Sequence, residues 1–331
     1  MTDTGMHGRY QNSRNLIQHF FRHELLRRVP HSVIRITNLP VLLRQEWVQW
    51  RGLNLLAFNA TKGEFVMAQT QVQPAPQFGE ALQPSQSHSA HIELVHGLDG
   101  LSPLAAASSP QAHALRMEII DAGRKLWERQ YVDGNGGNIS VRLGQNYLLC
   151  TPTMISKRDM APADICLSDF DGNILAGDRH RTSELLLHIE IYKNSPRARA
   201  VVHCHPPHAT AFAMTGTVPP NGLVSEYETC IGPAALAPYE TPGTQAFAET
   251  VRPFVRDHNT ILLSNHGIVC WADTVTHAEW FVETFENYCK TYLIARQIGN
   301  PLKFLPAEKI QELLAIKRRL GLPDARMDNS L

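Results

Sequence analysis

The sequence predicts a mixed α/β or α+β domain in which at least part of the sheet is antiparallel. Patterns typical of strands and of helices alternate from about residue 109 to residue 319, so both kinds of element belong to one domain. Several predicted strands are separated only by short turns, such as Asp171-Gly172, and turns of that length join antiparallel neighbours. No apolar run in the sequence approaches the roughly 20 residues that a membrane-spanning helix requires.

The first predicted helix begins at Ser109-Pro110, an N-cap residue followed by proline at the first helical position. Apolar residues recur at helical spacing as far as Leu126, and a glycine-rich turn over 133–138 then leads into a strand at Ile139-Ser140-Val141. The elements predicted after it are strands at 147–150 and 165–167, a helix from a Ser183 N-cap to residue 192, a strand at 200–203, a helix at 209–214, strands at 261–264 and 268–270, and helices at 277–298 and 308–319.

The composition changes twice along the chain, and a short C-terminal tail is predicted as well, so the chain has four predicted parts. Residues 1–66 are basic, rich in Arg and His, and without evident chemistry. They are interpreted as a disordered segment or a misassigned start before Met67, as an organelle-targeting segment, or as an accessory element. Residues 67–109 contain no Lys or Arg and many Gln, Pro and Ser residues, which is typical of a flexible linker. The functional domain is predicted at 110–322 and a short tail at 323–331.

Charge and cysteine content argue against several functional classes. Lys plus Arg and Asp plus Glu each total 31, so the net charge is zero and no nucleic-acid or membrane partner is predicted. The six cysteines form no Cys-x-x-Cys pair and are interpreted as reduced thiols rather than as a disulfide framework. Because the sequence shows no secretory pattern, the expected location is the cytoplasm.

The most informative pattern is an apolar strand that ends in His203-Cys204-His205. Residues two apart on a strand point to the same face, so His203 and His205 are expected to direct both imidazoles into one space. His266 follows a second apolar strand, and three protein ligands with one open position are typical of a catalytic zinc site. The alternative is a set of structural histidines that are satisfied by hydrogen bonds. Cys204 is expected on the opposite face as a buried thiol, and His208 at a helix start.

Two further features are ambiguous when each is taken alone. Glu184 stands near the start of a predicted helix, where a glutamate often only complements the helix dipole. The turn from Gly134 to Asn138 offers backbone N–H groups that can bind an anion, although most such turns are only turns. A carboxylate close to three histidines would make a metal-assisted enzyme.

Together, these features resemble the class II aldolase/adducin family over about residues 112–298. The match rests on several motifs in the family's order, which is far more specific than any one of them. The motifs are Gly136-Gly137-Asn138-Ile139-Ser140-Val141-Arg142, Thr151-Pro152-Thr153, Thr182-Ser183-Glu184, His203-Cys204-His205 with His208, Pro238-Tyr239-Glu240-Thr241-Pro242-Gly243-Thr244, and Asn265-His266-Gly267.

The resemblance implies an α/β fold in α/β/α layers, with a mostly antiparallel central sheet flanked by helices, and a homotetramer with its sites at subunit boundaries. It implies one divalent metal per chain, usually zinc (Zn), held by His203, His205 and His266, with Glu184 as the catalytic acid/base. A tyrosine that donates a proton from the neighbouring subunit in the family is matched here to Tyr227, the nearest candidate. The implied phosphate-binding residues are Asn135, Asn138, Thr153, Thr182 and Ser183.

The implied reaction is a zinc-dependent retro-aldol cleavage of a small ketose phosphate, or of a related hydroxy-keto compound, through a metal-stabilised enediolate. Decarboxylation, 4-epimerisation and dehydration within the same family are the alternatives, as is a non-catalytic scaffold of the adducin kind. The chain departs from the aldolase pattern at Met154, where glycine is typical, and at Asn135, where threonine is typical. Lys157 adds a charge nearby, and Glu184 stands where the epimerases typically have aspartate.

Overall fold

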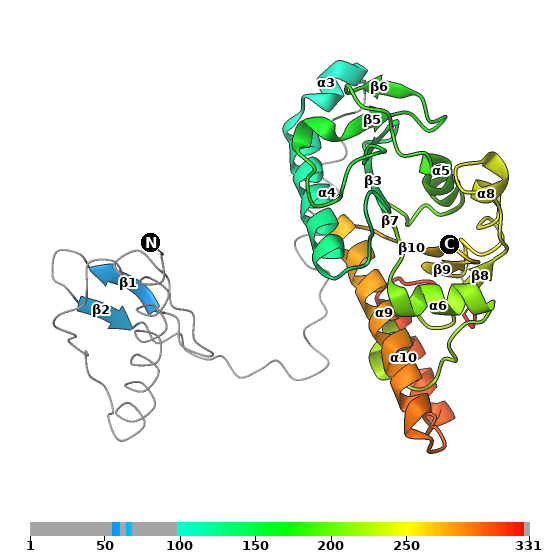
Figure 1. Cartoon of the computed structure of the whole chain (residues 1–331). Helices are drawn as coiled ribbons and strands as arrows, with labels where there is room; N and C mark the ends of the chain where they lie inside the picture. Colours follow the sequence, from blue (N-terminus) through cyan, green and yellow to red (C-terminus); the bar gives the residue numbers. More distant parts are fainter. Residues whose placement is uncertain (1–54, 60–63, 68–97, 99, 328–331) are drawn as a thin grey trace, which may run out of the picture. The chain divides into compact units, whose positions relative to one another are not determined.

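The computed structural model describes residues 55–59, 64–67, 98 and 100–327, and the chain separates into two units between residues 83 and 84. In the first unit, strands β1 (Leu55–Asn59) and β2 (Glu64–Met67) pair as an antiparallel hairpin. Most of the predicted basic extension and of the predicted linker lies outside the described residues. The second unit contains all the motifs named above, and Figure 1 shows its elements coloured along the chain.

The second unit is built on one eight-stranded sheet that is antiparallel except at one edge. Its strands lie in the order β6-β5-β4-β3-β7-β10-β9-β8, and the only parallel pair in this sheet is β8 with β9. This confirms the mostly antiparallel sheet that the resemblance implies. The strands are β3 (Asn138–Leu143), β4 (Tyr147–Cys150), β5 (Cys166–Ser168), β6 (Ile174–Ala176), β7 (Ala200–Cys204), β8 (Ala235–Ala237), β9 (Thr260–Leu263) and β10 (Gly267–Ala272).

Helices cover both faces of this sheet and bury two apolar cores, which confirms the α/β/α layers. One core joins α4, α6 and α9 to one face, and the other joins α5 and α8 to the opposite face (Figure 1). Alternate strand residues point to opposite faces, so Val202 lies in the first core and Val201 in the second. The helices are α3 (Pro103–Ala107), α4 (Pro110–Glu128), α5 (Leu185–Asn194), α6 (Pro207–Thr215), α7 (Ser225–Cys230), α8 (Gln245–Glu249), α9 (Val275–Ile298) and α10 (Ala307–Arg319), with a 3-10 turn at Pro162–Asp164.

Strand β7 lies at the centre of the sheet and carries the first predicted metal ligand. All five of its residues are buried between β3 and β10. His203 stands opposite Asn138 of β3 on one side and opposite Val269 of β10 on the other. Because Val201 and Val269 belong to the core beneath α5, His203 faces that helix. The N-cap residue of α5 is Glu184, so the fold brings the predicted acid/base to the same face.

Most predicted elements are confirmed to within a few residues, but several local details differ. The Ser109 hydroxyl accepts the N–H of Ala112 at 3.1 Å and begins α4 as predicted. The predicted Ser183 cap is wrong, because α5 begins after Glu184 and no side chain caps it. Several short elements without a periodic pattern, among them β6, β8, α7 and α8, were not predicted. Packed structure also begins before residue 109, since Leu98 and Ala106 are buried in the core that contains α4.

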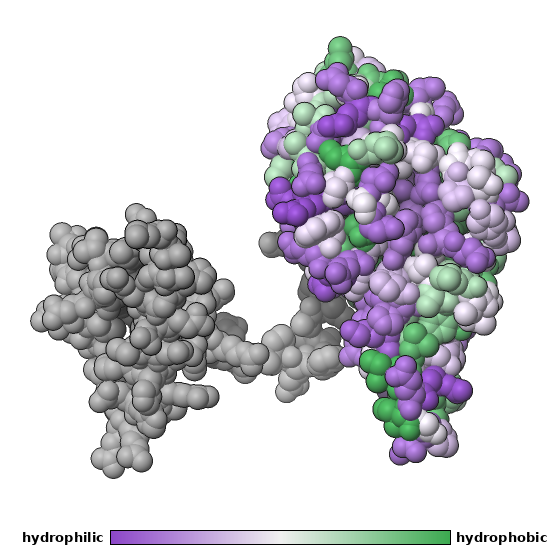
Figure 2. Space-filling model, viewed as in Figure 1, coloured by the Kyte–Doolittle hydropathy of each residue, from purple (hydrophilic) through white to green (hydrophobic). Residues whose placement is uncertain are grey.

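The surface seen in Figure 2 is mostly hydrophilic, and apolar residues gather over the end of this unit where α9 and α10 lie. Three large apolar side chains near this end, Ile294, Ile298 and Phe304, are each at least half exposed. Among the described residues, no helix is long and apolar enough to cross a bilayer. Exposed apolar side chains that gather at one end of a unit are candidates for contact with another protein surface.

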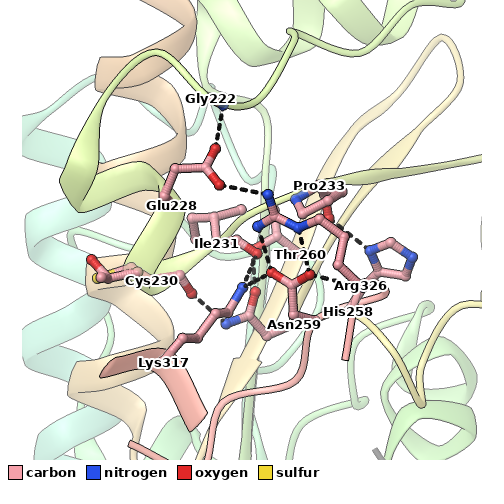
Figure 3. A network of polar contacts seen from close by, with 12 residues as sticks. Gly222, Glu228, Cys230, Ile231, Pro233, His258, Asn259, Thr260, Lys317 and Arg326 are labelled. Carbon is pink, nitrogen blue, oxygen red and sulfur yellow. Dashed lines mark hydrogen bonds and ion pairs between the residues drawn. The ribbon is translucent and has the colours of Figure 1, made fainter. Parts of the chain in front are cut away.

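The C-terminal segment is joined to α7 and α10 by a buried cluster of charges (Figure 3). Lys317 Nζ lies 2.8 Å from Asp324 Oδ2, and Arg326 bonds both Asp324 and Glu228. Burial alone would raise the pKa of Asp324, but Arg326 and Lys317 outweigh it and hold this pKa at about 2. Residues 323–327, which the sequence analysis assigns to a tail, are thus part of the packed unit.

Candidate metal centre

Three histidines from two strand ends converge beside the start of α5. His203 lies in β7, His205 follows the end of that strand, and His266 lies in the turn between β9 and β10. The candidate ligand atoms of the three rings all lie within 4.8 Å of one another. The Nε2 atoms of His203 and His205 are 3.1 Å apart. The structure therefore assembles the three predicted ligands into a group that could hold one metal ion.

Hydrogen bonds at the Nδ1 atoms of His203 and His205 orient the two rings so that their Nε2 atoms face each other. His203 Nδ1 donates to the carbonyl of Ile268 at 2.8 Å, and His205 Nδ1 lies 3.3 Å from a carboxylate oxygen of Asp133. A carbonyl oxygen only accepts, so Nδ1 of His203 carries the proton and its Nε2 presents a lone pair, and the contact with Asp133 favours the same tautomer for His205. Two nitrogen lone pairs directed into one space suit a bound cation, and outward N–H bonds of this kind are typical of metal-binding histidines.

Two glycines of the family motifs allow the backbone to approach the ligand strand closely. A Cβ at Gly267 would lie 2.5 Å from the carbonyl oxygen of Cys204 and 2.7 Å from the His205 ring. Gly137 has φ of +70°, and a Cβ there would lie 2.9 Å from the carbonyl oxygen of His203. Any larger residue at either position would overlap with the ligand strand, so both glycines are required by the geometry of the centre.

Glu184 lies against two of the three histidines. Its Oε2 is 3.2 Å from His203 Nε2, and its Oε1 is 3.4 Å from His266 Nε2. Burial raises the pKa of Glu184 above its usual value, in spite of the hydrogen bond that it accepts from Asn138. A carboxyl group with a raised pKa is suited to proton exchange near neutral pH. The predicted acid/base residue and the predicted ligands thus form one group.

Burial also keeps His203 and His266 in the neutral form that binds metals. It lowers the pKa of His203 well below its usual value and that of His266 to about 4. The Nδ1 atom of His266 has no hydrogen-bond partner among the described residues. Three imidazoles beside one carboxylate suit zinc, whereas magnesium and calcium prefer oxygen ligands. The donor set therefore fits the metal that the family resemblance implies.

The predicted phosphate-binding residues lie on three segments, residues 135–138, 151–157 and 180–184, which we call the cradle. The second and third segments pair through their backbones: the N–H of Thr182 donates to the carbonyl of Thr151, and the N–H of Thr153 to that of His180, both at 3.0 Å. Ser183 is exposed at the end of the third segment. The third cradle segment ends at Glu184, so the cradle lies beside the predicted acid/base residue. Binding of a phosphate by the cradle stays a prediction.

The two asparagines of the first cradle segment have different surroundings. Asn135 is exposed, and its amide donates to Met154 Sδ at 3.7 Å. Asn138 is buried, and both ends of its amide are hydrogen-bonded: Nδ2 donates to Glu184 at 2.8 Å, and Oδ1 is 2.6 Å from His188 Nε2. In this structure, both polar groups of the Asn138 side chain are therefore used within the protein, and its NH₂ group bonds the predicted acid/base residue.

Two departures from the aldolase pattern occupy special positions in the cradle. Met154 has φ of +56°, the left-handed region that favours glycine, and 78% of it is exposed. Lys157 is only 1% exposed, and its Nζ donates to the carbonyls of Asn135 at 3.0 Å and Ile155 at 3.1 Å. Burial lowers the pKa of Lys157 to about 8, so most molecules carry this charge at pH 7.

The other residues that the sequence singles out are not part of the group formed by the three histidines and Glu184. Tyr227 is 1% exposed and stacks on Tyr288 with ring centroids 3.8 Å apart, and burial raises its pKa well above its usual value. This is the environment of a core residue, so the geometry does not support Tyr227 as a proton donor. Cys204 is buried in the core on the opposite face, and His208 begins α6 beside Glu286, both as predicted.

Two residues that contact the predicted group were missed by the sequence analysis. Asp133 orients His205, and His188 lies beneath Asn138. His188 had a detectable signal, because Glu184, His188 and Tyr192 are spaced four residues apart on one helix. A stripe of polar and ionisable residues at that spacing, in a helix that also contains Leu185, Leu187, Ile189 and Ile191, indicates a buried polar network.

Comparison with known proteins agrees with this geometry. The family described as Class II Aldolase and Adducin N-terminal domain matches residues 117–293. The chain is 32% identical to the 5-deoxy-D-ribulose 1-phosphate aldolase of Bacillus thuringiensis serovar kurstaki over 200 residues, which cover 60% of this chain and 92% of that protein. It is 29% identical to the 3-oxo-tetronate 4-phosphate decarboxylase of Haemophilus influenzae over 199 residues, or 59% of this chain and 93% of that protein.

A solved structure of an L-fuculose 1-phosphate aldolase has the same architecture. It matches this chain with a TM-score of 0.57 and 28% identity, and the match covers 61% of this chain and 95% of that one. The family match over residues 117–293 contains the cradle, the three histidines and Glu184. The chain therefore belongs to the class II aldolase and adducin family and is an enzyme of that superfamily.

Proposed function

We propose that this enzyme is a zinc-dependent lyase that cleaves a C–C bond of a small ketose phosphate, or of a related hydroxy-keto compound, by a retro-aldol reaction. The observation that carries the proposal is the convergence of His203, His205 and His266 with Glu184, whose carboxylate lies 3.2 Å from His203. One metal ion per chain would be held by the three imidazoles. The similarity to two sugar-phosphate aldolases supports this substrate class.

Glu184 is assigned the proton transfers of the reaction. A divalent metal, when bound, polarises the substrate carbonyl and stabilises the negative charge that develops on its oxygen. Both carboxyl oxygens of Glu184 face the ring nitrogens, so a substrate bound at the histidines lies within reach of this acid/base. As the C–C bond breaks, the hydroxyl on the carbon that becomes the aldehyde gives up its proton, and Glu184 takes up this proton and returns it to the carbon that has become nucleophilic.

The anionic end of the substrate is assigned to the cradle. Asn135, Thr153, Thr182 and Ser183 offer amide, hydroxyl and backbone N–H donors, and Lys157 supplies a positive charge beneath them. With its phosphate in the cradle and its carbonyl at the histidines, a short sugar phosphate is held at both ends. Two-ended binding orients the bond to be cleaved toward Glu184.

A second candidate is decarboxylation of a keto acid phosphate. The observation that favours it is the 29% identity to a 3-oxo-tetronate 4-phosphate decarboxylase, close to the identity with the aldolase. Loss of carbon dioxide next to a carbonyl leaves the same kind of carbanion as a retro-aldol step. The histidines and Glu184 therefore suit either reaction, and which reaction occurs depends on the substrate that the enzyme binds.

The first experiment is elemental analysis of the purified protein beside a His203→Ala/His205→Ala variant. We expect about one zinc ion per chain in the wild type and none in the variant. The metal-loaded enzyme is then incubated with ketose phosphates and keto acid phosphates. Aldehyde release identifies the aldolase, carbon dioxide release the decarboxylase, and a new ketose an epimerase. A protein that holds no metal after reconstitution with zinc, and that forms no product, contradicts the proposal.

We propose a cytoplasmic homotetramer as the working form. Ile294, Ile298 and Phe304 are exposed apolar side chains at one end of the unit and are suited to contact between copies. A neighbouring copy also offers a source for the proton donor that Tyr227 does not supply. Light scattering is expected to give about four times the chain mass of 37.1 kDa. A mass equal to that of one chain contradicts the tetramer.

A further inference from the structure

Hydrogen bonds connect Glu184 to a histidine that lies entirely in the core. Glu184 Oε2 accepts from Asn138 Nδ2 at 2.8 Å, and Asn138 Oδ1 is 2.6 Å from His188 Nε2. On the other side of the imidazole ring, His188 Nδ1 is 2.7 Å from the hydroxyl of Ser140, which is 2.8 Å from the hydroxyl of Tyr192. His188 is fully buried, so no solvent replaces any of these bonds.

The direction of each hydrogen bond follows from the chemistry of its partners. The carboxylate of Glu184 only accepts, so the amide NH₂ of Asn138 must face it and the amide oxygen must face His188. Burial lowers the pKa of His188 to about 3, which leaves the ring neutral with a single N–H. That N–H is at Nε2, because it donates to the amide oxygen of Asn138, and Nδ1 accepts a hydrogen bond from the hydroxyl of Ser140. Tyr192 then donates to Ser140.

We infer that His188 is a positioning residue, which fixes the amide of Asn138 and through it the carboxylate of Glu184. This inference rests on the proposed role of Glu184 as acid/base. Without the N–H of His188, the amide of Asn138 is free to rotate by half a turn. Its oxygen would then face the carboxylate of Glu184 and repel it. Among the described side chains outside the three histidines, Asn138 is the one that donates to Glu184, so its orientation controls the rotamer of the acid/base.

A core role alone does not account for the whole arrangement. Ser140, Tyr192 and His188 could satisfy one another within the core, yet the second ring nitrogen of His188 is directed to Asn138 at the edge of the site. In a purely structural network, every change at residue 188 is expected to lower stability and turnover together. A positioning role predicts instead that turnover follows the N–H at Nε2.

Two amide variants separate these roles. The side-chain nitrogen of His188→Gln reaches about the position of Nε2 and can donate to Asn138, whereas that of His188→Asn reaches only the position of Nδ1. We expect His188→Gln to keep most of kcat and His188→Asn to lose about 10- to 100-fold. In both variants, KM is expected to change by less than about threefold, with the bound metal unchanged. Equal turnover in the two variants, whether retained or lost, overturns the inference.

A measurement without turnover tests the same assignment. Nitrogen-15 NMR of protein labelled at histidine reports which ring nitrogen of His188 is protonated, and His188→Gln identifies the signal by its absence. A neutral ring protonated at Nε2 supports the inference, and protonation at Nδ1 overturns it. If the wild type converts none of the substrates tested above, the proposed function fails, and the NMR result alone decides the role of His188.

Discussion

At the scale of single residues, Lys157 explains how a cradle made mainly of hydroxyls and amides acquires charge. Its ammonium group is buried and bonds two backbone carbonyls, those of Asn135 and Ile155, which leaves one of its three donors unused by these contacts. No carboxylate among the described residues forms an ion pair with Lys157. A buried cation that makes no direct ion pair, and whose pKa is raised only by the more distant Glu184, suits a site whose ligand brings the negative charge.

Replacing this lysine by methionine is therefore expected to weaken binding of phosphorylated substrates specifically. In Lys157→Met, KM should rise by roughly tenfold at pH 7, which corresponds to about 1.4 kcal/mol. Because the pKa of Lys157 is about 8, the wild-type KM should also rise as the pH increases through 8, while the KM of the variant stays flat. Steady-state kinetics from pH 6.5 to 9 measure both effects.

A matched control for Lys157→Met is Lys193→Met, which removes an exposed lysine at the end of α5. This control should leave KM unchanged at every pH. For a substrate analogue without the phosphate, wild type and Lys157→Met should have the same KM. An equal loss for both compounds would show that Lys157 supports the fold of the cradle rather than the charge of the ligand.

Glu184 is the residue on which the proposed chemistry depends most directly. Glu184→Gln keeps the shape and the hydrogen-bonding capacity of the side chain but removes the proton exchange. We expect kcat to fall by at least about 100-fold with the metal retained. Elemental analysis and steady-state kinetics on the same preparation measure this, with Glu249→Gln, an exposed glutamate of α8, as the control. Full activity in Glu184→Gln would remove its assigned role.

At the scale of secondary-structure elements, the periodic segments were predictable and the short ones were not. Helix α4 has a Ser-Pro start and regular apolar spacing, and its predicted limits agree with the structure. Elements such as β8 and α8 have three and five residues, too few to show a period, and tertiary contacts decide their conformation. The same limit applies to the site. The motifs identified His203, His205, His266 and Glu184, whereas Asp133 became evident only from its contact with His205. The four-residue spacing that marks His188 was present in the sequence but did not by itself indicate a contact with the site.

The charged cluster that joins α10 to α7 provides a test of element packing. The side chains of Lys317 and Asp324 are both fully buried, and removal of Lys317 leaves Asp324 with Arg326 as its partner in this cluster and removes the hydrogen bond to the carbonyl of Ile231. We expect Lys317→Met to lower the free energy of unfolding by about 2–3 kcal/mol, measured by urea denaturation. Lys309→Met on the same helix breaks an exposed pair with Glu312 and should cost less than about 1 kcal/mol. Similar losses in both variants would contradict the importance of burial.

The same cluster predicts a loss of stability in acid. The pKa of Asp324 is about 2 in the folded protein and near 3.8 in an unfolded chain, so the ionised form is stabilised by folding. The stabilisation is present above about pH 4 and is lost as the pH falls toward 2. Urea denaturation at pH 6 and pH 3 should show a smaller difference between wild type and Lys317→Met at pH 3.

At the scale of the whole molecule, the packed catalytic unit begins earlier than the composition indicates. Residues up to 109 contain no Lys or Arg after residue 67 and look like linker, yet helix α3 contributes Ala106 to the core and Leu98 is 4% exposed. Arg116 of α4 also donates to the carbonyl of Ala107 at 2.6 Å. The composition of this stretch is typical of a linker, and it gave no signal for the few apolar residues that pack in the core.

Two shortened proteins test where the unit begins. A chain that starts at residue 98 retains α3 and its contacts, and it should bind metal and unfold at the same temperature as the full chain. A chain that starts at residue 108 loses the burial of Leu98 and Ala106, which contributes about 2–3 kcal/mol. Its melting temperature should therefore fall by roughly 4–10 °C, with metal content unchanged because the three histidines lie far along the chain. Equal melting temperatures for the two shortened forms would place the start of the unit at α4, and loss of metal from the longer form would show that the preceding residues support the centre.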